Sequence, residues 1–218
     1  MLDFCLISVI VALDRLNFEI KEKVMTYVVS LPKIEGEGFC IRAFNEGDAP
    51  SLHRVLNDQE VTERLTNIPY PYNFFDATRW IHSTSTVVTE DSTRVNFAID
   101  IEGEIAGSVS FIKVDMQQEN AQLSVWIARK YWKQGLAGKA LKLLVEFGFE
   151  QMGLYRVSAF HVADNFKTQH LMTTLGFTLE GTHRKEWKKL VDGEYQRFDS
   201  LHYALLRDEW ERGVKNVR

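Results

Sequence analysis

A turn of small residues between a predicted strand and a predicted helix constrains this chain more than any other feature. The apolar run at residues 123–128 is typical of a strand, and apolar residues recur three or four apart over residues 136–147, which predicts a helix. Gly135, Ala137 and Gly138 lie at the junction, where no bulky side chain covers the backbone N–H groups. These first N–H groups have no partners within the helix, and the helix dipole makes that end positive. The turn therefore predicts a phosphate-type anion site, with an ordinary strand-to-helix connection as the alternative.

Two common phosphate-binding motifs do not fit this turn. A Walker A loop requires G-x-x-x-x-G-K followed by serine or threonine, but Lys139 is followed by Ala140. The dinucleotide motif G-x-G-x-x-G also fails, because positions 137 and 140 are both alanine. The turn therefore does not support an ATPase or a Rossmann dehydrogenase.

Composition narrows the class of protein further. The 218 residues suit one domain, and 45% hydrophobic with 26% charged residues is typical of a soluble globular protein. A net charge of −4 argues against nucleic-acid binding, which needs a basic face. Cys5 and Cys40 show no metal or redox spacing and indicate a reducing, cytoplasmic location. The six histidines form no H-E-x-x-H or similar cluster, so no metal site is expected.

The N-terminal segment stands apart from the rest of the pattern. Residues 2–13 are apolar, but this run is shorter than the roughly 20 residues that span a bilayer. It also lacks the basic start and small-residue cleavage site of a signal peptide. We therefore interpret residues 1–30 as an appendage of unknown role, with Met25 as an alternative start, and residues 31–218 as the domain.

Strand and helix patterns alternate along the domain, without internal repeats. The second half contains a strand followed by a helix that Asn165 can cap, and Asp76 can cap an earlier helix. The expected elements are a strand at 38–44, a hairpin of 93–101 with 104–113, a strand at 156–162, and a hairpin of 186–191 with 194–205 around Asp192 and Gly193.

Two motifs resemble those of one enzyme superfamily. The stretch YWKQGLA at residues 131–137 resembles the pyrophosphate loop Q/R-x-x-G-x-G/A of GNAT acetyltransferases, with Trp132 at its first position. The aromatic-Trp pair there resembles the RimJ/RimL branch. The stretch NFKTQHLMTTLGF at residues 165–177 resembles the second GNAT motif, N-x-x-S-x-x-L-x-x-x-L-G-F. The resemblance covers roughly residues 33–210.

The resemblance implies an α/β (α+β) fold with a mixed, splayed sheet flanked by helices. Two strands separate, and the pantetheine arm of acetyl-coenzyme A, the implied co-substrate, lies in the gap like an added strand. Its pyrophosphate meets the amides of the small-residue turn. The implied cofactor-binding residues are Trp126, Ile127, Ala128, Lys133, Gln134, Gly135, Leu136, Ala137, Gly138 and Asn165.

The implied reaction is direct attack of a primary amine on the acetyl thioester. An α-amine, with a pKa near 7.8, loses its proton about 3.5 kcal/mol more easily than a lysine near 10.4. A protein N-terminal α-amine is therefore the leading acceptor, and a small-molecule or antibiotic amine is the alternative. A catalytically silent acyl-coenzyme A sensor is a second class of function. No nucleic acid or membrane is expected as a partner, and either a monomer or a homodimer is compatible.

Two residues carry the implied chemistry. Thr168 replaces the serine of the second motif and keeps the hydroxyl that would face the coenzyme sulfur. Met172 occupies the position of the tyrosine acid found in many GNAT enzymes and has no proton to donate. Glu186 is the predicted general base, by resemblance to RimL-like enzymes, and a solvated glutamate on a basic hairpin is the alternative.

Overall fold

The computed structural model describes residues 27–28, 31–63, 65, 68–84, 87–88, 94–191 and 194–215. Most of the N-terminal appendage and the predicted turn at Asp192 and Gly193 therefore lie outside the described residues. No helix in the described ranges is both long and apolar enough to cross a bilayer.

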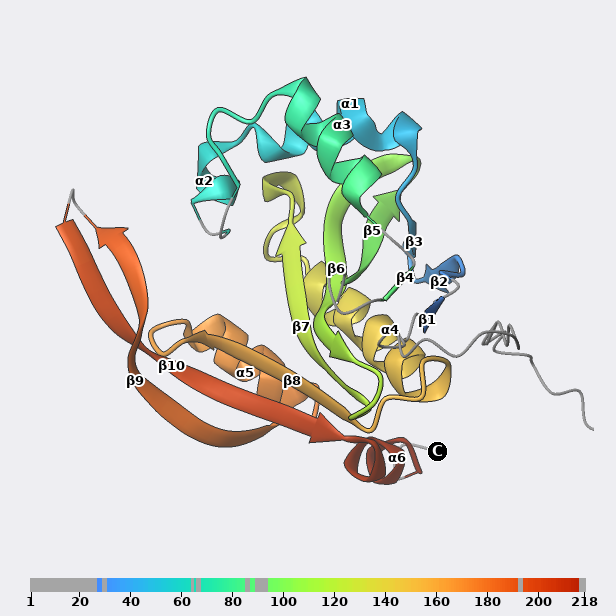
Figure 1. Ribbon diagram of the computed structural model, residues 1–218, viewed down its shortest axis with the longest axis vertical. Coiled ribbons are helices and arrows are strands. Elements are labelled where there is room, and N and C mark those ends of the chain that lie inside the picture. Colours follow the sequence, from blue (N-terminus) through green and yellow to red (C-terminus); the bar gives the residue numbers. More distant parts are fainter. Residues whose placement is uncertain are drawn as a thin grey trace, which may run out of the picture.

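An eight-stranded sheet forms the centre of the molecule (Figure 1). Its order is β2-β3-β5-β6-β7-β8-β10-β9, and every neighbouring pair is antiparallel except β7 with β8. The strands are β2 (Ile34–Gly36), β3 (Phe39–Ala43), β5 (Val95–Ile101), β6 (Glu104–Asp115), β7 (Asn120–Ile127), β8 (Arg156–Val162), β9 (Thr178–Val191) and β10 (Glu194–Leu206). A separate pair joins β1 (Tyr27–Val28) to β4 (Val87–Val88). The mixed sheet confirms the predicted fold class.

Helices cover both faces of this sheet. They are α1 (Ala49–Leu56), α2 (Gln59–Thr62), α3 (Phe74–Ser83), α4 (Leu136–Glu150), α5 (Phe166–Thr174) and α6 (Arg207–Lys215). On one face, α4 and α5 enclose a core that includes Phe97, Leu123 and Val157. On the other face, α1, α2 and α3 pack on Ala98 and Trp126. Each strand side chain can therefore be assigned to the α4 face or the α1–α3 face by its alternation.

Most predicted elements are confirmed near their expected bounds, and β8 matches its prediction completely. The role expected for Asp76 was wrong. The N-cap of α3 is Asn73, whose Oδ1 accepts from the N–H of Asp76 at 2.9 Å, while Asp76 Oδ2 accepts from the N–H of Asn73 at 3.2 Å. Asp76 is therefore the third residue of a capping box, because asparagine supplies an equally good cap three residues earlier.

The two parallel strands separate as predicted. β7 and β8 pair only at Asn120 with Arg156, Ala121 with Val157, and Gln122 with Ser158. Beyond this point the strands have no register partners across the junction, and Figure 1 shows them diverging. The backbone groups on the facing edges of the separated segments therefore have no partner on the opposite strand, and an extended ligand can pair with such an edge.

A buried ion-pair network joins the α1–α3 layer to the sheet. Arg42 on β3 donates to both oxygens of Asp48 at 2.8 Å and, through Nε, to Asp100 on β5 at 2.7 Å. The three side chains are at most 18% exposed. Hydrogen bonds with Asp48, and then with Asp100, raise the pKa of Arg42 above its ordinary value. Arg42 therefore fixes the start of α1 relative to β3 and β5.

We expect Arg42→Met to lower the free energy of unfolding by about 3–5 kcal/mol, because it leaves two largely buried carboxylates without their cation. Lys33→Met is the matched control, since Lys33 forms an exposed pair with Glu35 at 2.7 Å and its loss should change stability little. Urea denaturation of the three proteins measures the difference. Equal stability of the Arg42 and Lys33 variants would contradict this account of the network.

Candidate active site

The small-residue turn has the backbone shape of an anion site. After β7 the chain forms a 3-10 turn at Arg129–Tyr131, and Lys133 (φ 63°) and Gly135 (φ 74°) then adopt left-handed conformations on either side of Gln134. Turns that contain left-handed residues direct successive N–H groups toward one concave side. The conformation costs a lysine about 1–2 kcal/mol, so the surrounding structure must impose it.

The N-terminus of α4 is open. Gly135 is its N-cap residue, no side chain caps the helix, and no acidic residue lies in the first turn. The N–H groups of Leu136, Ala137 and Gly138 are therefore available to an anion. Nearby side chains are engaged elsewhere. Lys139 pairs with Glu37 at 2.7 Å and lowers the pKa of that carboxyl, and Gln134 Nε2 donates to the carbonyl of Lys130 at 2.8 Å.

The backbone of β7 offers different groups to the gap than the sequence indicated. The N–H of Ala128 donates to the carbonyl of Ala106 on β6 at 2.8 Å. The backbone N–H and C=O groups of successive residues point to opposite edges of a strand. Those of Trp126 therefore also point toward β6, whereas those of Val125 and Ile127 point toward the gap. The indole of Trp132 already donates to the carbonyl of Ile127 at 2.7 Å. Val125, which the sequence interpretation omitted, is therefore placed to bind an extended arm together with the N–H of Ile127.

Asn165 and Thr168 lie at the start of α5, which follows the free end of β8. Asn165 is the N-cap, and its Oδ1 accepts from the backbone N–H of Thr168 at 3.2 Å. The capping function of Asn165 is thus confirmed, whereas its contact with the cofactor stays a prediction. Thr168 is half-buried. Because the hydrogen bond to Asn165 uses the backbone N–H of Thr168, the hydroxyl of Thr168 stays available to a ligand.

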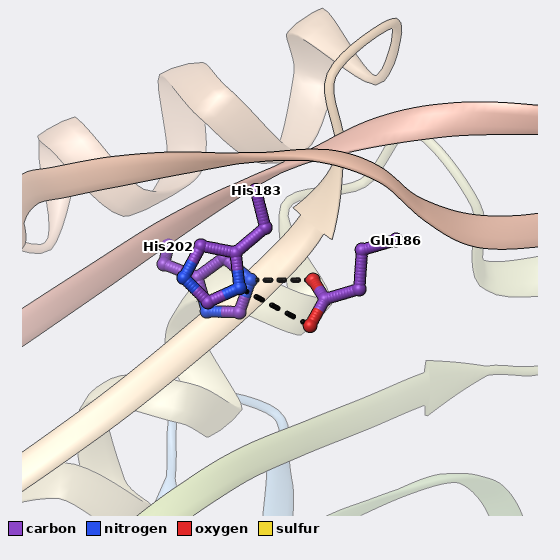
Figure 2. A group of neighbouring side chains, drawn as sticks. All are labelled: His183, Glu186 and His202. Atoms are coloured by element: carbon purple, nitrogen blue, oxygen red, sulfur yellow. Dashed lines mark hydrogen bonds and ion pairs between the residues drawn. The ribbon is translucent and has the colours of Figure 1, made fainter.

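Glu186 lies in a cluster that the sequence analysis did not assemble (Figure 2). Its Oε1 lies 3.2 Å from His183 Nδ1, and its Oε2 lies 2.8 Å from His202 Nε2. The hydroxyl of Ser200 also donates to Oε2. The two imidazole rings stack with their centroids 3.7 Å apart. Hydrogen bonds from Ser200, His202 and His183 lower the pKa of the Glu186 carboxyl to about 2.

The register of the sheet places this cluster beside the gap. His202 lies opposite Phe160 on β8, two residues beyond the last residue that pairs with β7. Val157 and Ala159 face α4, so Phe160 and its neighbour His202 lie on the other face, the one that α1–α3 cover in part. The phosphate-type turn and the cluster therefore lie on opposite faces of the sheet, with the gap between them.

An irregularity in the hairpin brings Glu186 into the cluster. His183 pairs with Ser200 and Trp187 pairs with Phe198, so three residues of β9 face the single residue Asp199. Lys185, within this bulge, has a φ of 54°, and its N–H donates to Asp199 Oδ1 at 2.9 Å. Without the bulge, Glu186 and His183 would point to opposite faces, because they are an odd number of residues apart. Bulges often re-aim a side chain in this way beside an active site.

The three side chains also form a group that a search for metal ligands would select. Ligand atoms of His183, Glu186 and His202 lie within 4.8 Å of one another. No metal site was expected from the sequence, because these residues come from two strands and do not all lie close together in the chain. Two imidazoles and a carboxylate are a known ligand set for zinc. A bond from an imidazole nitrogen to a metal lies in the plane of the ring. Because the two rings stack face to face, they do not both direct such a bond at a single ion.

Gln122 is a further polar group at the gap that sequence reasoning missed. It is 9% exposed, and its Oε1 is buried without a hydrogen-bond partner. It lies where β7 and β8 part, and its side chain is on the α1–α3 face. A buried carbonyl without a donor is costly, so this oxygen is suited to accept from a ligand N–H. A single polar residue within a strand carries no distinctive sequence signal.

Comparison with known proteins agrees with this geometry. A model of the acetyltransferase (GNAT) domain matches residues 39–178. Spermidine N(1)-acetyltransferase of Escherichia coli is 29% identical over 161 residues, which cover 72% of this chain and 80% of the relative. Two solved structures share the fold. One is the ribosomal L7/L12 alpha-N-protein acetyltransferase RimL with coenzyme A, which has a TM-score of 0.68 and 18% identity over 82% of this chain and 99% of that one. The other is Vibrio cholerae spermidine N-acetyltransferase with CoA and spermine, which has a TM-score of 0.66 and 19% identity over 80% of this chain and 98% of that one.

The family match spans the open turn, the gap and the helix that Asn165 caps. It includes both motifs on which the sequence resemblance depended. The chain therefore belongs to the GNAT acetyltransferase family and is an acetyl-transferring enzyme whose co-substrate is acetyl-coenzyme A.

Proposed function

We propose that this enzyme transfers the acetyl group to a protein N-terminal α-amine by direct attack on the thioester. The observation that carries the proposal is the gap between β7 and β8, which joins the open end of α4 on one face to the polar cluster on the other. Pantetheine lies in the gap against Val125 and Ile127, and the pyrophosphate binds the turn from Lys133 to Gly138. The amine approaches from the face of Glu186.

The charge of the β9–β10 hairpin supports an α-amine over a polyamine. Exposed basic side chains extend along the hairpin beside Glu186, and they are Arg184, Lys185, Lys188, Lys189 and Arg197. Such a surface repels a polycation and attracts an acidic peptide segment. We also infer a cytoplasmic location, in agreement with the free thiol of Cys40.

A small polyamine is the second candidate acceptor. The observation that favours it is the 29% identity to a spermidine acetyltransferase over 72% of this chain. The chemistry at the thioester is the same for both acceptors, because each presents a primary amine. The two candidates differ in the charge that must be accommodated along the hairpin.

Thiol release from acetyl-coenzyme A distinguishes these acceptors. The panel contains acidic and basic peptides with free N-termini, the same peptides with blocked N-termini and one lysine, and spermidine. We expect the fastest release with acidic peptides that have a free N-terminus. Release with spermidine alone would establish the second candidate. Tight binding of acetyl-coenzyme A without release from any amine would instead indicate the sensor function.

Thr168 is proposed to donate a hydrogen bond to the coenzyme sulfur as the thiolate leaves. We expect Thr168→Val to lower kcat about 10- to 100-fold, because a hydrogen bond to a charged group contributes roughly 1.5–3 kcal/mol. Thr168→Ser keeps the hydroxyl and should retain most activity. Steady-state kinetics on the best acceptor, with the Kd of acetyl-coenzyme A measured beside it, check this. Equal kcat values for the valine and serine variants would refute the role.

A further inference from the structure

Glu186 is better suited to hold a base than to be one. Its carboxylate accepts hydrogen bonds from Ser200, His202 and His183, and these lower its pKa to about 2. An α-amine has a pKa near 7.8, so transfer of its proton to this carboxylate is unfavourable by about six units. An ordinary histidine, with a pKa near 6.5, is much closer to the amine. The cluster contains two imidazoles, the side-chain type that most often acts as a general base.

The hydrogen-bond network assigns the tautomer of both histidines. The hydroxyl of Ser200 donates to Glu186, and an ionised carboxylate can only accept. The His202 Nε2 atom at 2.8 Å from Oε2 must therefore carry a proton, and so must His183 Nδ1 at 3.2 Å from Oε1. In the neutral ring, this leaves the lone pair of His202 on Nδ1 and that of His183 on Nε2.

Position and contacts distinguish the two histidines. His202 lies on β10, directly beside β8, whereas His183 lies on β9, one strand farther from the gap. His202 Nε2 also lies 3.0 Å from the Ser200 hydroxyl, so two groups hold its ring. Its side chain is 25% exposed, against 56% for His183. His202 is therefore the nearer and better fixed of the two.

We propose that His202 Nδ1 accepts the proton of the attacking amine through one water molecule, with Glu186 and Ser200 as positioning residues. This inference rests on the proposed function. The amine nitrogen forms a bond to the acetyl carbon, the carbon–sulfur bond breaks, and its electrons leave on the thiolate. The proton from nitrogen resides on His202 and then returns through solvent to the thiolate, which gives the amide and coenzyme A.

Charged and aromatic groups of β8 and β9 surround His202. On β9, the Glu186 carboxylate lies 2.8 Å from His202 Nε2, and the ring of His183 stacks on the His202 ring. Glu180, also on β9, is paired with Arg156 of β8 at 2.5 Å, and its pKa is lowered mainly by that pair and to a lesser degree by His202. The aromatic ring of Phe160 on β8 stacks on His202 without adding charge.

The test compares His202→Ala, Glu186→Gln and the control His82→Ala on the best acceptor of the panel. His82 is exposed near the end of α3 and lies outside the cluster. We expect His202→Ala to lower kcat about 100-fold or more, with an unchanged Kd for acetyl-coenzyme A and partial rescue by added imidazole. Glu186→Gln should lower kcat at an unchanged Kd for acetyl-coenzyme A, because a neutral amide holds the Nε2–H of His202 less firmly than a carboxylate does.

Several outcomes would overturn the inference. If the wild type turns over while His202→Ala keeps its kcat and pH profile, His202 is not the base, although the enzyme remains an acetyltransferase. Lack of imidazole rescue in a folded, acetyl-coenzyme A-binding His202→Ala protein would assign it a structural role. Loss of wild-type activity with a chelator, and recovery with Zn²⁺, would make the cluster a metal centre. Absence of transfer to every amine would overturn the proposed function as well.

Discussion

Gly135→Glu is expected to raise the Kd of acetyl-coenzyme A at least about 100-fold. A Cβ at this position meets no atom within 4 Å, so the new side chain has room, although the left-handed backbone (φ 74°) makes any side chain there strained. The effect on cofactor affinity is electrostatic. The carboxylate would lie where the open N–H groups of α4 are proposed to bind the pyrophosphate. Repulsion of about 3 kcal/mol, typical of like charges at such distances near a protein surface, corresponds to this loss. Isothermal titration with coenzyme A measures it.

The opposite end of the same helix supplies the control. Gly153 also has a left-handed backbone (φ 76°) and open space around its Cβ position. Gly153→Glu therefore introduces the same charge and the same backbone strain, but far from the proposed phosphate site. We expect it to lose stability like Gly135→Glu and to keep its affinity for acetyl-coenzyme A. Equal loss of affinity in both variants would attribute the effect to folding and remove support for the anion site.

Gly107→Ala is expected both to destabilise the protein and to weaken cofactor binding. Gly107 lies on β6 opposite Ile127, and a Cβ there would approach the backbone oxygen of Trp126 to 2.3 Å. Backbone cannot rotate away as a side chain can, so β7 must shift at the edge of the gap. We expect the free energy of unfolding to fall by about 1–3 kcal/mol. The affinity for acetyl-coenzyme A should fall at least about tenfold, because Ile127 moves.

Gly213→Ala serves as the matched substitution for this experiment. Gly213 lies in α6, and a Cβ there meets nothing within 4 Å. Alanine is the better helix former, so this variant should be at least as stable as the wild type. Thermal unfolding with and without coenzyme A measures both effects. A Gly107→Ala protein with wild-type affinity would show that the end of β7 does not form the proposed binding edge.

Local chemistry made the backbone geometry of the proposed cofactor site predictable from the sequence. Gly135 and Asn165 each act through the backbone next to them, one by its left-handed conformation and the other by capping a helix. Such effects depend on a few consecutive residues, which a sequence displays directly. The direction of each backbone N–H group of β7 was harder to predict from the sequence. It depends on which residues pair with β6, so Val125 was omitted although its neighbours were named.

The acceptor side depends on long-range register, and the sequence analysis did not assemble it. If the two strands paired regularly outward from the turn at Asp192 and Gly193, position 183 would pair with position 202. The pairing of the two histidines was therefore predictable from the sequence. Glu186 would then have pointed to the other face. The bulge that reorients it depends on Asp199, which binds the backbone of Lys185 across the hairpin. A contact of this kind has no local pattern.

Amide hydrogen exchange with and without coenzyme A tests the central claim most directly. The N–H groups of Leu136, Ala137 and Gly138 begin a helix and have no capping side chain, so they should exchange rapidly in the free enzyme. We predict that coenzyme A slows exchange at these amides and at Val125 and Ile127, while α1 and α3 are unchanged. Protection between α1 and α3, with none at the turn or along β7, would contradict the assignment of the gap as the cofactor site.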